Sequence, residues 1–397
     1  MTMGTEPLTR DEAIARLKNG DSLSGADLRG ADLRELNLAG VDFSGADLTQ
    51  ARLDGASLRK AKLNGSRMTG ATIAGTLLFE ATVEAPRILE ADLRGAVLSK
   101  SNFAGADFSG RDLSKCVLAE CDLRGARFAG ARLKDTDFTG ANLEGADFSK
   151  AAMLGPIFEK ANLAKANLTG AEVTAASFLG ASMDEANLGD VRFKSTDFTG
   201  VDLAKARIAA TSFRQCTFKG SLLVKRDLKK CDFTCADLGE ADLTGAVLDG
   251  ATLTKADLSA AKLKGASLAS VSARFANFSK ADLEGAKLKG AFLRETNLTS
   301  AKLREADFTK ADLTQALAHK IDAKLTIFHD ATLKYADLSF AIVEGADFAR
   351  ADLFGATLHG VREKLAKWDG ATMTLVKRTD LEKLEAEQWK PPPPEKK

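Results

Sequence analysis

The sequence has little of what usually supplies chemistry. Among 397 residues there are three histidines, one tyrosine and two tryptophans. Lys plus Arg total 56 and Asp plus Glu total 55, so the net charge is +1 and neither sign dominates. No apolar run is long enough to span a membrane, and the opening MTMGTEPLTRDE lacks a signal-peptide core. We therefore expect a cytoplasmic protein with no membrane association.

Cysteine is also scarce and follows no ligand pattern. The five cysteines form no CxxC or Cys/His spacing, which argues against a metal site. Four of them occupy a slot that alanine fills elsewhere in the chain, and Cys235 lies at a different position. We read them as small buried thiols in a reducing compartment. No cofactor is expected.

What the chain has in abundance is one five-residue phrase, seen in Ala236 to Leu258 as ADLGEADLTGAVLDGATLTKADL. Its Leu position, the centre, recurs every fifth residue from Leu23 to Leu358 without an insertion or deletion. Of these 68 positions, 65 hold Leu, Phe, Met, Ile or Val, and the exceptions are Ala273, Ala318 and Ala323. So strict a register predicts one repeated architecture.

The period fits a short extended segment followed by a corner. Alternate side chains of an extended segment share a side, so the centre and the small residue two before it should point inward. The fifth residue is often Gly, which tolerates corner dihedrals. Ten pairs of centre phenylalanines are separated by 20 residues and only three by 5. Stacked rings would produce this spacing, so we expect four walls per coil and 17 coils.

Phrases such as GADLRGADL, GADFSGRDL and GANLEGADF resemble the pentapeptide-repeat family. The resemblance covers about nine-tenths of the chain. It implies an all-β fold, a right-handed quadrilateral (four-sided) parallel β-helix of about 17 coils with short capping helices. We expect an N-terminal capping helix in residues 1–20, the β-helix in 21–373, and a capping helix with a Pro-rich tail in 374–397. The repeat is a structural rule, so it says little about function.

Both ends carry helix signals. Thr9 and Glu12 form a capping-box pattern before a short amphipathic helix that stops at Gly20. The helix should cover the open end of the coil, whose unpaired edge invites aggregation. Thr379 to Trp389 predicts a second helix, and Pro391 to Pro394 a polyproline II segment. The leader LTRDEAIARLKNGDSLSGADL also resembles leaders of pentapeptide arrays in type VI secretion accessory proteins.

Several positions break the rule. Pro86 and Pro156 predict a local loop or bulge, because proline removes a backbone donor. Arg111 and Arg226 occupy the small inward slot, so the wall should open or the side chain should reach outward; a tolerated distortion and a partner site are both open. In Leu317 to Phe328 two successive centres are alanine. We expect a distorted coil or a projecting loop there.

Two outward columns bear on binding. One is apolar and, with Asp137 filling a gap, forms the candidate partner-binding set Leu77, Val97, Val117 and Ile157. Strand propensity and a docking strip both explain it. The other is basic, but an acidic column lies two residues earlier, so we expect a solvated mixed face. The members of the basic column are Arg34, Arg94, Lys134, Lys194, Arg214, Arg274, Arg294 and Lys334.

These features point away from catalysis, since a tube filled by Leu, Phe and Ala has no room for a substrate pocket. We expect a non-catalytic, rigid protein–protein interaction scaffold. A sharper version is a bacterial type VI secretion adaptor linking an effector to the spike, exported without a signal peptide.

The resemblance also implies an alternative, a DNA mimic that binds a type II topoisomerase (gyrase), as in quinolone-resistance pentapeptide proteins. That role needs strongly negative faces. Nucleic acid is not an expected partner, and a homodimer through a capped end is one possible assembly.

Overall fold

The structure is a computed structural model that describes residues 6–82 and 90–388. The chain forms two compact units, Met1–Arg207 and Ile208–Lys397. Pro86 and the tetraproline Pro391 to Pro394, for which a loop and a polyproline II segment were predicted, lie outside the described residues.

Each five-residue repeat has the same backbone. The residue before the centre forms a parallel bridge, and a two-residue turn follows the centre. The last residue of the repeat, the corner, is left-handed almost throughout, with φ of 67° at Gly30 and 58° at Lys60. Glycine adopts this conformation without strain, which explains why it is common at corners.

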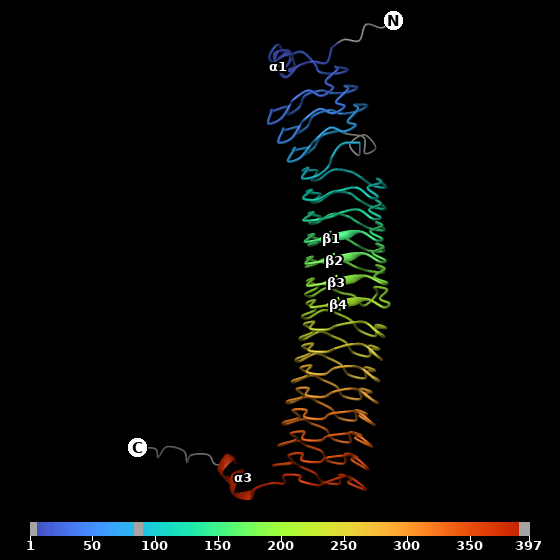
Figure 1. The fold of residues 1–397 in the computed structure, drawn as a ribbon, viewed down its shortest axis with the longest axis vertical. Helices are drawn as coiled ribbons and strands as arrows, with labels where there is room; N and C mark the ends of the chain where they lie inside the picture. The colour runs from blue at the N-terminus through green and yellow to red at the C-terminus, as the bar shows by residue number, and fades with distance from the viewer. Residues whose placement is uncertain (1–5, 83–89, 389–397) are drawn as a thin grey trace, which may run out of the picture. The chain divides into compact units, whose positions relative to one another are not determined.

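Bridges join residues that are 20 apart in the sequence, such as Asp47 with Arg67 and Asp237 with Asp257. The predicted right-handed, four-sided parallel β-helix is therefore confirmed. In the first unit, β1 (Ala152–Leu154), β2 (Glu172–Thr174) and β3 (Arg192–Lys194) lie on one wall of successive coils (Figure 1). The second unit contains β4 (Ser212–Arg214).

The core of each unit is built from the centres and the small residues two positions before them. In the first unit, Phe178 stacks between Phe158 and Phe198 at centroid distances of 4.9 and 5.0 Å, with ring planes within 3°. In the second unit, Phe328 stacks on Phe348 at 4.7 Å. These rings are fully buried or nearly so, as the 20-residue phenylalanine spacing predicts.

The first helix, α1 (Arg10–Lys18), begins at the predicted capping box. Thr9 accepts a hydrogen bond from the Glu12 amide, and the Glu12 carboxylate accepts one from the Thr9 amide at 2.8 Å. Arg10 donates to the carbonyl oxygens of Asp32 and Arg34, both at 2.9 Å. Ala13 of α1 is fully buried, as is Leu23, the first centre. The helix therefore covers this end of the first unit.

The coil of the second unit runs slightly further than expected. Its last bridge joins Thr357 to Lys377, and Trp368 stacks on Phe348 at 4.3 Å. The second helix, α3 (Leu381–Gln388), is present, but it lies beside the last coils and contacts His359 there (Figure 1). The centre Met373 stays half-exposed. The predicted second helix is therefore present beside the last coils.

Two predicted irregularities are wrong. Residues 317–328 form an ordinary part of the coil, because bridges such as Leu317 with Asp337 continue through them and Ala318 and Ala323 are buried. Backbone bonds therefore carry the coil even where the centre is small. Pro156 also causes no bulge. In other repeats the amide at its position closes a turn, as Ala161 does, whereas the adjacent Ile157 makes the bond between coils.

Of the two inward arginines, Arg111 reaches outward as expected, whereas the Nε of Arg226 is buried. Arg111 is exposed and Arg226 is half-buried. The Arg111 carbonyl still accepts from the Arg132 amide at 2.9 Å, so the guanidinium reaches outward without breaking the bonds between coils.

Candidate interaction surface

The four apolar residues of the candidate set lie on one wall of the first unit. Leu77 bridges to Val97 and Val97 to Val117. Val117 continues through Asp137 to Ile157. We call Leu77, Val97, Val117 and Ile157 the apolar strip. The sequence spacing placed all four correctly in one column.

The strip faces outward because of the alternation within each repeat. Leu78 and Leu98, the centres that follow Leu77 and Val97, are buried at 1% and 0% exposure. Leu77 and Ile157 are each 39% exposed. Val97 and Val117 are half-buried, and Val97 lies between Leu77 and Val117 in the column. The apolar surface is continuous from Leu77 to Val117, and Asp137 separates it from Ile157.

Two further exposed leucines lie near Ile157 and were missed in the sequence. Leu154 is 48% exposed and precedes the corner Gly155, and Leu179 is 47% exposed on the coil after Ile157. Their signal was an apolar residue directly after a centre, a position that is usually polar in this chain. Leu154 also lines a hollow of about 280 Å³ with Ala152, Arg132 and Lys134. Leu154 and Leu179 thus add two exposed apolar side chains near Ile157 in the sequence and on the next coil.

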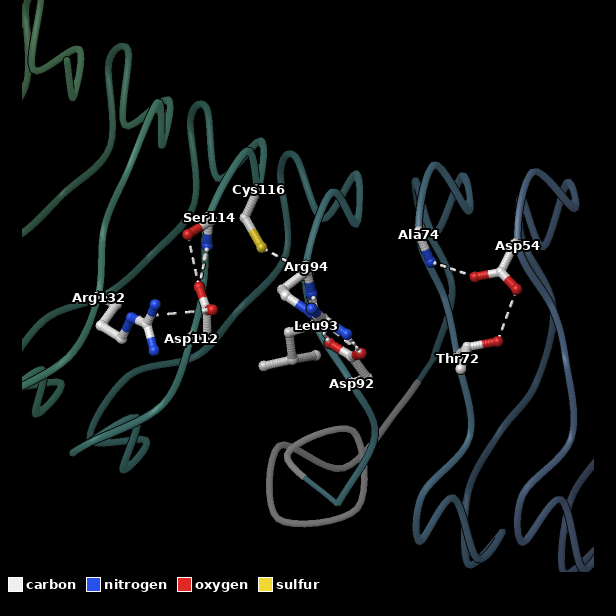
Figure 2. Close-up of polar contacts among 10 residues, drawn as sticks. All are labelled: Asp54, Thr72, Ala74, Asp92, Leu93, Arg94, Asp112, Ser114, Cys116 and Arg132. Carbon is white, nitrogen blue, oxygen red and sulfur yellow. Dashed lines mark hydrogen bonds and ion pairs between the residues drawn. The ribbon is translucent and has the colours of Figure 1, made fainter. Parts of the chain in front are cut away.

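The wall before the strip is polar and internally paired. Figure 2 shows Asp92 bonded to Arg94, and Asp112 accepting a hydrogen bond from Ser114 and forming an ion pair with Arg132. The guanidinium of Arg94 holds the pKa of Asp92 below its usual range. In the basic column, six of the eight members pair with a carboxylate: Arg34, Arg94, Arg214, Arg274, Arg294 and Lys334. This confirms the mixed face, because the acids interleave with the cations.

The repeated aspartates have a structural role. In Figure 2, Asp54 accepts from the Ala74 amide at 3.0 Å and from the Thr72 hydroxyl at 2.6 Å. More often the aspartate before a centre accepts from the amide two residues later, as Asp112 does from Ser114 at 3.0 Å. Such bonds satisfy turn amides that the coil leaves free. These carboxylates therefore accept hydrogen bonds from the coil itself and do not point toward one common site.

The histidines do not form a site together. His319 packs edge-on against Phe340, His329 lies 3.9 Å from the Asp330 carboxylate, and His359 contacts Glu387 at 3.1 Å. Within the described ranges, no group of three or more His, Cys, Asp or Glu side chains could hold a metal ion.

The cysteines lie as predicted. Cys116, Cys121, Cys216 and Cys231 are buried and Cys235 is exposed, and all are free thiols. Burial raises the pKa of Cys116 to about 12 and that of Cys121 to about 11. The Cys116 thiol donates to the Leu93 carbonyl at 2.6 Å (Figure 2). The Cys116 and Cys121 thiols are therefore protonated at neutral pH and are poor nucleophiles.

Across the described helices, none has the length and apolar character needed to cross a bilayer.

The coil geometry defines a β-helical solenoid built from five-residue units. The family model described as pentapeptide repeats matches the sequence in segments from residue 22 to residue 362. The chain belongs to the pentapeptide-repeat family. Among curated proteins, none matches the sequence.

Several solved pentapeptide-repeat structures are similar to this chain. HetL, involved in heterocyst differentiation regulation in the cyanobacterium Nostoc sp., shares 22% identity over 72% of this chain and 87% of its own, with a TM-score of 0.24. A protein of the Arabidopsis thaliana thylakoid lumen shares 33% identity over 25% of this chain and 69% of its own, with a TM-score of 0.19. QnrB1, a plasmid-mediated fluoroquinolone resistance protein, shares 19% identity over 55% of this chain and 98% of its own, with a TM-score of 0.18.

Proposed function

We propose that this protein is a non-catalytic protein–protein interaction scaffold and that the apolar strip binds its partner. The observation that carries the proposal is the bridged column Leu77–Val97–Val117, continued at Ile157, which presents apolar side chains outward on a regular backbone. Contiguous exposed apolar surface tends to mark an interface, whereas scattered single residues do not. The parallel ladder holds the column in place, so little ordering entropy is lost on binding.

The polar environment of the strip supports a protein partner. Ser57 and Ser177 end the column, and the preceding wall carries paired charges such as Asp92 with Arg94. An apolar centre with a polar rim is the usual anatomy of a protein interface. Leu154 and Leu179 would extend the contact beyond the four residues of the strip.

The charge distribution disfavours the DNA-mimic alternative. A mimic of duplex DNA needs a continuous negative face. Here cations interleave with the acids in both units, as in the pairs Arg34 with Asp32 and Lys334 with Asp352. The similarity to QnrB1 therefore does not lead us to propose topoisomerase binding for this chain.

A finer form of the proposal is an adaptor in type VI secretion that links an effector to the spike in a bacterial cytoplasm. It rests on the resemblance of the leader before Leu28, in which α1 and its capping box lie. Purified spike and effector proteins from the same organism provide the test. Binding of both to this chain supports the adaptor, and binding of neither removes it.

A homodimer through one end is also part of the proposal. Trp368 and Met373, the last two apolar centres of the second unit, are half-exposed. Light scattering on the purified chain and on Met373→Asp tests this arrangement. We expect a dimer that the substitution converts to a monomer, and a wild-type monomer would contradict it.

The proposed strip is tested by Val97→Asp combined with Val117→Asp. Both side chains point away from the core, so thermal stability should stay near that of the wild type. Quantitative capture of partners from the native lysate should fall at least tenfold, because two charges would be buried without counterions. A matched control places aspartates on another wall of the same unit, at Asn102 and Asn142. Unchanged capture by the strip variant would mean that the column reflects strand propensity alone.

A further inference from the structure

The second unit carries large apolar residues at corners, where the backbone is left-handed. They are Phe275, Leu325, Tyr335, Phe340, Leu365 and Leu375, with φ between 57° and 62°. The described corners of the first unit hold glycine, alanine or polar residues instead. A left-handed backbone is unfavourable for a branched side chain, and exposure leaves apolar surface in water. A position that carries both energetic costs suggests a function.

Two of these corners frame a groove. Leu325 is 57% exposed and Leu365 is 80% exposed, and between them lies Gly345. A methyl group on Gly345 would be 2.8 Å from Leu325 Cδ2, so the Leu325 side chain lies directly over this glycine. The groove has a volume of about 380 Å³, and we call it the Leu325–Leu365 groove. Leu325 and Leu365 supply its large apolar side chains.

The rim of the groove is positively charged overall. Arg304, Lys324 and Lys364 line it together with Glu305 and Glu344. Glu344 pairs with Lys324 at 2.9 Å and with Arg362 at 2.6 Å, and Arg304 pairs with Asp322 at 3.9 Å. Lys364 makes no ion pair within the part of the chain that the structure describes. The groove therefore favours an apolar ligand that carries carboxylates.

A neighbouring corner shows what this kind of surface accepts. At Phe340 the ring lies over Gly360, in the same way that Leu325 lies over Gly345. There α3 packs against the coil, and its Glu387 contacts the buried His359 beside the Phe340 ring. The sequence of α3, LEKLEAEQ, has three glutamates and one lysine. The acidic helix α3 thus lies beside the corner formed by Phe340 and Gly360.

We propose that the Leu325–Leu365 groove is a second binding site, for an acidic amphipathic helix of a partner protein. Leucines on one face of the helix would contact Leu325 and Leu365, and a glutamate beside them would pair with Lys364. The chain's own C-terminal tail is a poor occupant, because residues 389–397 contain three lysines and one glutamate. Its acidic helix α3 is already bound at His359. This site is independent of the apolar strip.

Fluorescence anisotropy with a labelled amphipathic peptide of about 18 residues, long enough for a helix, tests the proposal on the full chain. The peptide has leucines on one face and glutamates on the other, and a second peptide has lysines in place of the glutamates. We compare the wild type with Leu325→Gly combined with Leu365→Gly. Glycine relieves the left-handed backbone, so the double variant should unfold at or above the wild-type temperature. Leu375→Gly is the matched control at another corner.

We expect the acidic peptide to bind the wild type and Leu375→Gly equally, and to bind the double variant at least tenfold more weakly. The basic peptide should bind at least tenfold more weakly than the acidic one. Absence of wild-type binding, equal binding to the double variant, or equal binding of the basic peptide would overturn the proposal. Loss of peptide binding in the single variant Phe340→Gly would also overturn the proposal. It would show that the peptide displaces α3 and binds at the Phe340 corner instead of the Leu325–Leu365 groove.

Discussion

The ring of Phe178 lies on the ring of Phe158 with centroids 4.9 Å apart and planes at 3°, although twenty residues separate them in the chain. This stacking shows that one turn of the coil takes twenty residues. Equivalent positions recur after four repeats, so a feature repeated every twentieth residue becomes a column on one wall. The apolar strip and the phenylalanine stacks are both consequences of that rule.

Replacing Phe178 by Ala should leave a cavity in the stack of the first unit. The side chain is fully buried between two rings, so the expected cost is about 3–5 kcal/mol. In a solenoid the loss is local, because each repeat contacts mainly its neighbours. Amide hydrogen exchange should accelerate in the coils around Phe178. Leu179→Ala, one residue later and 47% exposed, is the control. Equal effects of the two substitutions would contradict the stacked core.

The aspartates before the centres should matter as acceptors and not as charges. Asp257 accepts from the Ser259 amide at 2.8 Å and from the Asn277 side chain at 3.0 Å. Asp257→Ala should cost about 1 kcal/mol, because both donors lose their partner. Asp257→Asn keeps an acceptor oxygen and should be nearly neutral. Urea unfolding measures both, and similar losses for the two variants would show that the charge itself is required.

The buried thiols predict a loss of stability in alkali. Burial raises the pKa of Cys116 to about 12 and that of Cys121 to about 11, whereas an unfolded thiol titrates near 8.5. The folded state therefore holds these protons more tightly. Their contribution is complete below about pH 8.5 and is lost as the pH rises toward 11 to 12. The unfolding temperature should fall over that window, and less steeply in Cys116→Ala combined with Cys121→Ala. Identical slopes would refute the assignment.

His359 should hold α3 against the coil. Its Nε2 lies 3.1 Å from Glu387, and its Nδ1 accepts from the Asp380 amide at 3.4 Å. His359→Ala should speed amide exchange in α3 and leave exchange around Phe328 unchanged. Partner binding at the apolar strip should not change, since the strip lies in the first unit. Loss of binding at the strip with the fold intact would contradict a role of His359 that is confined to α3.

The sequence predicted most of the fold because a single rule governs it. The period places Phe158 below Phe178, and the Thr9–Glu12 pattern locates the start of α1. The sequence-based prediction failed at positions where an unusual residue leaves the backbone of the coil unchanged. Ala318 and Ala323 look like breaks in the pattern, but bonds between coils do not depend on the size of the centre. Pro156 lacks only a turn donor that the ladder does not use.

The candidate surface was predictable in part for the same reason. The column Leu77, Val97 and Val117 follows from spacing alone. Leu154 and Leu325 do not, because their neighbours depend on how a side chain lies across the next corner. The position of α3 beside His359 also has no sequence signal. It depends on contacts of a helix with a side wall, outside the repeat rule.

Photo-crosslinking tests the central claim most directly. A benzophenone amino acid is placed at position 97, at position 117, or at the control position 102 on another wall, and each protein is irradiated in its native cells. We predict a discrete adduct of one partner protein from positions 97 and 117 and none from position 102. Equal adducts at all three positions, or none at 97 and 117, would contradict the assignment of the apolar strip as the binding surface.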